Sequence, residues 1–263
     1  MPTTPAQAGV NGVDMDAAIE VFVRAFAYGR SFTHPYLPER VGRMWVVRDG
    51  PRKNPADYRR EEWIAAGVEA AEVDRLARAG TRGRYCICAI RGQGEDDAPL
   101  RAAYKSLGYR LQCTEPFMAH RLRRVPKLPE PYPVVRVTTR ELADRLAKAA
   151  RGRQVRPEHF RPDSPLWQYA ALDGLRPVGW VRSILVESGA GPAAWVSNMF
   201  VEPAYRRRGI GRSLLARMLR DDRARGAARS VLLSSHTGAL LYPHVGYEPI
   251  GELMIYTPKK NGT

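Results

Sequence analysis

The segment 201–215 combines glycines, arginines and the start of an apolar-faced helix, a combination suited to binding an anion. It reads Val-Glu-Pro-Ala-Tyr-Arg-Arg-Arg-Gly-Ile-Gly-Arg-Ser-Leu-Leu. Gly209 and Gly211 permit backbone angles and close approaches that a Cβ atom would prevent. The first N–H groups of a helix have no partner within it and attract phosphate. The segment is therefore predicted to be a phosphate-binding turn, and four arginines give it positive charge: Arg206, Arg207, Arg208 and Arg212.

Two common phosphate-binding motifs do not fit this segment. A Walker-type loop ends in Gly-Lys-Ser/Thr, and residues 206–215 contain no lysine. A dinucleotide fingerprint needs a small residue where this chain has Leu214, and an acidic residue about 20 positions further on, where 228–232 reads Ala-Arg-Ser-Val-Leu. The remaining pattern, Arg-x-x-Gly-x-Gly, by itself favours an ordinary strand-to-helix turn in an arginine-rich protein.

A second pattern, Tyr-x-x-x-Gly-Tyr, follows at 242–247. A helix-terminal glycine followed by a core aromatic residue also produces it in unrelated folds. Together and in this order, the two patterns resemble those of the GNAT superfamily of acetyl-coenzyme A-dependent N-acetyltransferases. In this resemblance Arg206, Gly209 and Gly211 correspond to the coenzyme motif. Tyr242 corresponds to a tyrosine that commonly serves as general acid.

The resemblance implies where acetyl-coenzyme A, the cosubstrate, is held. Its pyrophosphate would take backbone N–H groups of the turn, and its thioester oxygen would face N–H groups at the end of the preceding strand. One such donor is typically worth roughly 2.7–4 kcal/mol in the transition state. Tyr242 would protonate the departing thiolate. The coenzyme-binding residues expected in this way are Met199, Phe200, Val201, Arg206, Arg207, Arg208, Gly209, Ile210, Gly211, Arg212 and Ser213.

The acceptor amine must lose a proton, so a base or an ordered water is needed. Many members of the superfamily carry a carboxylate on the strand before the turn, whereas 193–201 contains none. Glu187 and Glu202 flank this strand, and each is equally well explained as a solvated charge. Ser197 and Asn198 could order a water instead, so the base is unassigned.

Hydrophobic patterning predicts an α/β fold around these residues. Apolar runs bounded by turn residues predict strands at 134–137, 169–172, 177–187, 193–201, 230–234 and 253–256. An apolar-faced helix starts near Ile210, and the sequence Thr-Thr-Arg-Glu at 138–141 supplies a capping signal for another. The resemblance covers about residues 134–258 and implies a mixed, mostly antiparallel central sheet flanked by helices.

The N-terminal half repeats part of this pattern. Tyr-Lys-Ser-Leu-Gly-Tyr at 104–109 has the spacing of 242–247 and also follows an apolar run, although six residues of shared spacing also arise by chance. The apolar run 44–47 is followed by two prolines and no Gly-x-Gly. We predict two tandem GNAT copies, of which the first is degenerate and cannot hold coenzyme A. The expected organisation is a flexible tail at 1–12, a degenerate domain at 13–122, a proline-rich linker at 123–133, a catalytic domain at 134–258 and a tail at 259–263.

Composition sets further bounds. The chain has 263 residues, 44% of them hydrophobic, and a formal net charge of +15. No apolar run is long enough to predict a membrane span, and the N-terminus shows no apolar leader. Cysteines and histidines lack metal-ligand spacing, so we expect no metal, and the cysteine usage suits a reducing cytoplasm. The positive charge would suit nucleic acid, but the sequence shows no dense basic stripe interleaved with aromatic residues, so we do not expect nucleic acid as a partner.

These observations predict an enzyme, a GNAT-type acyltransferase that moves an acetyl group from acetyl-coenzyme A to a primary amine of a small molecule or peptide. One alternative is a non-catalytic acyl-coenzyme A sensor or scaffold, because the strand carboxylate is missing. A weaker alternative, suggested by charge alone, is an RNA-associated protein. No motif specifies the acceptor. The residues considered for its groove, which a solvated loop explains equally well, are Arg156, His159, Phe160 and Arg161.

Overall fold

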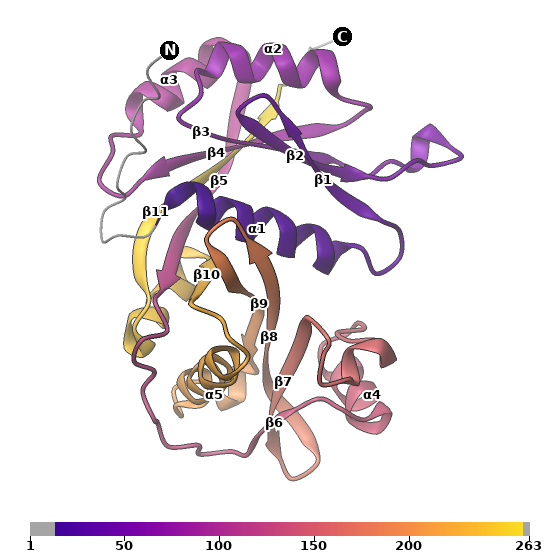
Figure 1. Cartoon of the computed structure of the whole chain (residues 1–263), viewed down its shortest axis with the longest axis vertical. Helices are drawn as coiled ribbons and strands as arrows, with labels where there is room; N and C mark the ends of the chain where they lie inside the picture. Colours follow the sequence, from indigo (N-terminus) through magenta and orange to yellow (C-terminus); the bar gives the residue numbers. More distant parts are fainter. Residues whose placement is uncertain (1–13, 260–263) are drawn as a thin grey trace. The chain divides into compact units, whose positions relative to one another are not determined.

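The computed structural model describes residues 14–259 (Figure 1). The tails predicted at 1–12 and 259–263 therefore lie outside the described residues, apart from Lys259. The described chain forms two compact units. Unit 1 contains the residues up to Phe117 together with those from Pro249, and unit 2 runs from Met118 to Glu248. Unit 1 is thus built from both ends of the chain.

Unit 1 is a mixed sheet with helices on both faces (Figure 1). Its elements are α1 (Met15–Arg30), β1 (Tyr36–Val41), β2 (Met44–Asp49), η2 (Pro55–Asp57), β3 (Glu61–Ala66), α2 (Ala70–Gly80), β4 (Tyr85–Gly92), α3 (Ala98–Ser106), the first part of β5 (Tyr109–His120) and nearly all of β11 (Glu248–Pro258). β1, β2 and β3 pair antiparallel in succession. β4 pairs parallel to β3, and α2 makes the crossover that a parallel pair requires.

Unit 2 repeats this order of antiparallel strands followed by a helical crossover. Its elements are β6 (Val134–Arg136), α4 (Arg140–Ala149), η3 (Pro157–Phe160), β7 (Leu166–Asp173), β8 (Arg176–Ser188), β9 (Gly191–Val201), η4 (Pro203–Tyr205), α5 (Ile210–Ala224), β10 (Arg229–Leu233), α6 (His236–Ala239) and η5 (Tyr242–Val245). β6 to β9 pair antiparallel, and β10 pairs parallel to β9. The predicted fold class, a mixed and mostly antiparallel sheet flanked by helices, is confirmed. No helix in residues 14–259 is long and apolar enough to cross a membrane.

The core of unit 2 lies between its sheet and α5. The five residues predicted on one face of this helix are all buried and pack against apolar residues of β8 and β9: Ile210, Leu214, Leu215, Met218 and Leu219. Gly179 on β8 allows this approach, because a Cβ there would lie 3.1 Å from Ile210 Cγ2 and 3.2 Å from Leu214 Cδ1. At the start of α4, Thr139 Oγ1 accepts a hydrogen bond from the Leu142 N–H at 3.3 Å. A threonine of the predicted capping signal is thus the cap, although the Thr-x-x-Glu spacing selects Thr138, one residue earlier.

The proline-rich segment 121–133 contains no helix or strand but is attached to the turn before α5 and to α5 itself. Arg208 Nη1 donates a hydrogen bond to the Tyr132 hydroxyl at 3.0 Å. Arg220 Nη1 donates to the Pro126 carbonyl at 3.3 Å. The segment is therefore held to the rest of unit 2 by side chains that lie much later in the sequence.

The last strand, β11, differs from the expected organisation. The sequence places it in a domain at 134–258, whereas all but its first residue lies in unit 1, where it pairs antiparallel with β4. Its Tyr256 ring stacks on Tyr104, with ring centroids 4.4 Å apart. An apolar run predicts a strand but not its neighbour, because the pairing partner lies far away in the sequence.

Asp222 is a fully buried carboxylate on α5. Its two oxygens lie 2.7 Å and 2.8 Å from the Ser183 hydroxyl, and Arg225 Nη1 is 3.8 Å away. Burial raises the pKa of Asp222 to about 7 in spite of these two partners, which lower it. The folded protein therefore holds a proton on Asp222 at pH values where the unfolded chain has released it.

We expect Asp222 to make the fold less stable as the pH rises from about 4 to about 7. The folded state binds more protons than the unfolded state in this window, so the free energy of unfolding falls by up to about 1.4 kcal/mol per pH unit. The isosteric variant Asp222→Asn cannot titrate. Denaturant unfolding of both proteins across this range should show the wild type losing stability relative to the variant and levelling off above pH 7. A pH-independent difference would contradict the assignment.

Candidate functional site

A cleft opens in unit 2 where β9 and β10 separate. These parallel strands pair over four residues, ending at Val196 opposite Leu232. β9 then continues to Val201 without pairing to β10. The resulting main cleft has a volume of about 840 Å³. It is lined by the unpaired end of β9, the turn before α5 and the segment that follows β10.

β9 carries a bulge where it lines the main cleft. Between Ser197 and Phe200, β9 has one residue more than the segment of β8 that pairs with it. Asn198 adopts a left-handed φ of 52°. Its Nδ2 donates to Gln154 Oε1 at 3.1 Å, and Arg182 Nη2 donates to the Gln154 carbonyl at 2.6 Å. A bulge bends its strand, so these contacts hold β9 in the bent course that leads away from β10.

The turn before α5 exposes a row of backbone N–H groups. Arg207 and Gly209 are left-handed, with φ of 63° and 83°. In the described part of the chain, the N–H groups of 207–212 have no hydrogen-bond acceptor. The N–H of Ser213 donates to the Gly209 carbonyl at 3.0 Å, and its buried hydroxyl donates to the Ile210 carbonyl at 2.9 Å. Free N–H groups at a left-handed turn and at the start of a 15-residue helix are an arrangement suited to an anion, and this arrangement ends before Ser213.

Three of the four predicted arginines line the main cleft: Arg206, Arg207 and Arg212. Arg206 Nε donates to the Val201 carbonyl at 3.0 Å, which ties the turn to the end of β9. Arg208 lies elsewhere, because its guanidinium bonds Tyr132 and lies 5.2 Å from the centre of the Tyr205 ring. Among the predicted coenzyme-binding residues, Arg208 and Ser213 thus do not line the cleft.

The remaining predicted coenzyme-binding residues line the main cleft together: Met199, Phe200, Val201, Gly209, Ile210 and Gly211. At Gly211 a Cβ would lie 3.1 Å from Met199 Cε and 3.1 Å from Leu241 Cδ2. A side chain at this position would therefore narrow the cleft. A Cβ at Gly209 would have space, since its nearest neighbour would be Pro131 Cγ at 3.9 Å. Glycine is favoured at this position by the left-handed backbone conformation instead.

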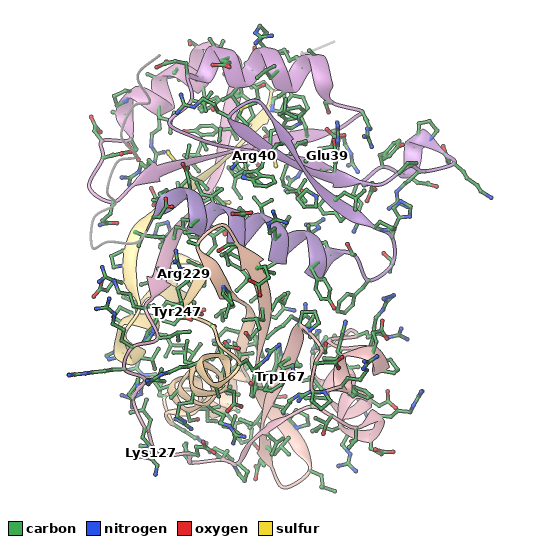
Figure 2. All side chains as sticks on the ribbon, in the orientation of Figure 1. Glu39, Arg40, Lys127, Trp167, Arg229 and Tyr247 are labelled. Carbon is green, nitrogen blue, oxygen red and sulfur yellow. The ribbon has the colours of Figure 1, made fainter. Side chains whose placement is uncertain are left out.

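Tyr242 starts the short helix η5 and lines the main cleft. It is 6% exposed, and burial raises its pKa to about 12, so the phenol keeps its proton at neutral pH. Its ring packs edge to face on Tyr247, labelled in Figure 2, with centroids 5.5 Å apart. Between them Gly246 has a φ of 97°, and a Cβ there would lie 2.8 Å from His120 Nε2. The glycine and the second tyrosine fix the position of Tyr242.

The matching segment of unit 1 has the same local structure beside strands that stay paired. Tyr104 and Tyr109 pack edge to face with centroids 5.7 Å apart, and Gly108 has a φ of 83°. Tyr104 is 1% exposed. All six residues of β3 pair with β4, so these strands do not separate as β9 and β10 do. The tyrosine–glycine pattern is therefore a packing device in both units, and the separated strands distinguish the surroundings of Tyr242.

The wall after β10 contains lining residues that the sequence did not single out: Ser234, Ser235, Thr237, Gly238, Leu240 and Leu241. Ser234 Oγ is buried and has no hydrogen-bond partner among the described residues. His244 also lines the main cleft, whereas His236 does not. The only sequence signal was a pair of serines directly after an apolar strand, which is too common to indicate a site.

The residues considered for the base and the acceptor groove lie in different places. Ser197 and Asn198 line the main cleft. Glu202 lines a second, side cleft, whereas Glu187 is exposed and lines neither. Neither cleft is lined by the four loop residues Arg156, His159, Phe160 and Arg161. Within residues 14–259, no group of three or more His, Cys, Asp or Glu side chains could hold a metal ion.

Comparison with known proteins gives one family and several structures. A family model of the acetyltransferase (GNAT) domain matches residues 167–249. A GCN5-related N-acetyltransferase from Kribbella flavida is 16% identical, with a TM-score of 0.62 over 92% of this chain and 96% of its own. A putative GNAT acetyltransferase from Novosphingobium aromaticivorans is 18% identical, with a TM-score of 0.51 over 92% of this chain and 99% of its own. A tandem GNAT protein from the clavulanic acid biosynthesis pathway is 14% identical, with a TM-score of 0.51 over 95% of this chain and 97% of its own. No curated protein matches.

We expect Ser234→Ala to leave the ligand-free protein at least as stable as the wild type. A buried hydroxyl without a partner costs about 1–3 kcal/mol, and alanine removes it. Ser230→Ala is the matched control, because the Ser230 hydroxyl is also buried but bonds the Tyr247 hydroxyl at 2.6 Å. That variant should lower the melting temperature. Thermal unfolding checks both variants, and a larger loss for Ser234→Ala would contradict the prediction.

Proposed function

From the GNAT acetyltransferase domain that the chain contains, we propose that the protein transfers an acetyl group from acetyl-coenzyme A to a primary amine of a small molecule or peptide. The observation that carries this proposal is the separation of β9 and β10 beside a turn with free N–H groups. Acetyl transfer needs an anion site for the pyrophosphate and, nearby, donors for the thioester oxygen. Both are backbone features of one cleft.

In this proposal the turn before α5 binds the pyrophosphate. The N–H groups of 207–212 would donate to its oxygens, while Arg206, Arg207 and Arg212 add positive charge. Arg208 has a structural role instead, because it holds Tyr132. Because the donors are backbone N–H groups, pyrophosphate binding would depend more on the backbone conformation at Gly209 and Gly211 than on the arginine side chains.

The unpaired end of β9 would hold the thioester. Within the segment Met199, Phe200 and Val201, backbone N–H groups that point away from β8 are the proposed donors to the oxygen that becomes negative during attack. The neutral amine forms a C–N bond with the carbonyl carbon as the C–S bond breaks. Tyr242, protonated at neutral pH, gives its proton to the leaving sulfur. The nitrogen, positively charged after attack, releases a proton to solvent, and solvent returns one to the phenol. The proton that the ammonium loses passes to water ordered near Ser197.

We also propose that unit 1 is a degenerate GNAT copy and that each chain holds one coenzyme. The same strand order, crossover helix and tyrosine pair support the common origin of the two units. The full pairing of β3 with β4 argues against coenzyme binding in unit 1. The free thiols of Cys86, Cys88 and Cys113 suit a reducing compartment, and we assign the protein to the cytoplasm.

One alternative has a specific observation in its favour. β9 carries no carboxylate, which is compatible with a sensor that binds acyl-coenzyme A without transferring the acyl group. The two functions differ in turnover and not in coenzyme affinity, so the experiments below measure both.

We expect Gly209→Ala to weaken acetyl-coenzyme A binding about tenfold. Alanine at a φ of 83° is strained by about 1–2 kcal/mol, and relief of that strain would turn the N–H groups of the turn away from the ligand. Isothermal titration calorimetry measures the dissociation constant.

The matched control is Gly191→Ala. Gly191 has a φ of 88° with open space around it, but it is the first residue of β9, directly after the turn from β8, and does not line the main cleft. Both variants should lose similar stability, and only Gly209→Ala should lose affinity. Equal affinities in the two variants would rule out the turn as the pyrophosphate site.

We expect Tyr242→Phe to lower kcat by at least about 100-fold while leaving acetyl-coenzyme A affinity within about threefold of the wild type. General acid catalysis typically contributes 100- to 10,000-fold. Turnover is measured as thiol release with a panel of primary amines. Tyr104→Phe, the equivalent change in unit 1, should leave kcat unchanged. Undiminished turnover in Tyr242→Phe would remove the tyrosine from the mechanism, and absence of turnover in the wild type would favour the sensor.

A further inference from the structure

Unit 2 contains a second cleft beside the bulged strand. This side cleft has a volume of about 680 Å³ and is lined by the end of α4, Gln154, Trp180 and the segment 198–203, except Val201. Asn198, Met199 and Phe200 line both clefts. Two molecules, one in each cleft, would therefore meet at these three residues. The proposed function needs a second substrate at this point, beside the N–H groups that would hold the thioester.

The floor of the side cleft is aromatic. Trp180 on β8 pairs in register with Phe200 on β9, and their rings stack with centroids 4.7 Å apart and planes 25° from parallel. Phe200 is 38% exposed, which is unusual for a large apolar side chain in the middle of a sheet. Trp180 is 6% exposed, so the exposed part of the stack is Phe200, and the Arg206 guanidinium lies 5.7 Å from the centre of the Phe200 ring. The exposed part of Phe200 offers a surface for an apolar or aromatic group.

The side cleft also contains a fixed carboxylate. Among the described residues that line the two clefts, Glu202 is the only acidic one. Its side chain is 17% exposed, and its Oε2 accepts a hydrogen bond from Arg176 Nη2 at 2.5 Å. It follows Phe200 by two residues, so the carboxylate and the ring stack belong to one short segment. A single ammonium group could pair with Glu202 while the carbon skeleton of the same molecule covers the ring stack.

The remaining charged residues of the two clefts are basic: Arg151, Arg206, Arg207 and Arg212. A molecule with several ammonium groups would place one of them against Glu202 and the others in the field of these arginines. Like charges brought together in a cleft cost binding energy and so act against the wrong ligand. Polyamines and other polycations are therefore poor matches. An amino acid that paired its ammonium with Glu202 would bring its own carboxylate, next to that ammonium, against the Glu202 carboxylate.

We propose that the side cleft binds the acceptor, and that this acceptor is a primary monoamine with an aromatic or bulky apolar body. Trp180 and Phe200 bind the body, and Glu202 is a positioning residue that attracts the ammonium toward Met199 and Phe200. This inference rests on the proposed function, because it names the substrate class of the same reaction.

The test compares four amines at saturating acetyl-coenzyme A: phenethylamine, butylamine, spermidine and glutamate. We expect kcat/KM for phenethylamine to exceed that for spermidine and glutamate at least tenfold, with butylamine between. Glu202→Gln should raise KM for phenethylamine at least fivefold with a smaller effect on kcat. Glu187→Gln is the matched control, since Glu187 is exposed outside both clefts, and should change neither value.

A second variant tests the ring stack. Trp180→Leu should raise KM for phenethylamine at least fivefold and KM for butylamine less, and a thermal unfolding curve shows whether it folds. Calorimetric binding of phenethylamine to the protein saturated with coenzyme A needs no turnover. Phenethylamine binding that is weakened by Glu202→Gln would support the proposed acceptor site even if no amine were acetylated. Absence of acetylation would then contradict only the proposed catalysis. Turnover with equal or greater preference for spermidine or glutamate, or failure of phenethylamine to bind, would overturn the acceptor class.

Discussion

The loss of backbone pairing between β9 and β10 after Val196 is the constraint on which the candidate site depends. Parallel strands normally continue to exchange hydrogen bonds, and an unpaired backbone N–H away from water is costly. Here β9 runs on to Val201 with its edge open. The bulge at Asn198 bends the strand, and Gln154 accepts the Asn198 side-chain hydrogen bond. The open edge lines the main cleft, and residues 198–200 at the bulge also line the side cleft.

α5 packs against the strands that border the main cleft. The apolar face of α5 fills the space below β8 and β9, and Gly179 lets the helix lie close to the sheet. Gly211 then leaves the first turn of the helix without a side chain where Met199 and Leu241 approach. The two glycines thus have different roles. Gly179 lets the helix approach the sheet, and Gly211 leaves space in the main cleft.

Local sequence features predicted the elements and the turn, whereas contacts between distant segments decided the rest. The Thr139 cap, the apolar face of α5 and the left-handed Gly209 follow from residue types and short spacings. The role of Arg208 did not, because its partner Tyr132 lies 76 residues earlier. The side cleft was missed for the same reason, since it brings the end of α4 together with β8 and β9. Strand membership was also non-local: β11 has the predicted apolar pattern, yet it pairs with β4.

The two tyrosine–glycine segments show how little of the chemistry resides in a local motif. Both units end a helix with a left-handed glycine and pack the following tyrosine edge to face on the preceding one. In unit 1 the first tyrosine is closed in by the stacked ring of Tyr256, beside strands that stay paired. In unit 2 the strands separate, and the first tyrosine, Tyr242, faces the space between them. The motif positions a phenol in both cases, but only open strands give that phenol access to a ligand. A search for active copies of this fold should therefore examine the strand pairing beside the tyrosine before the tyrosine itself.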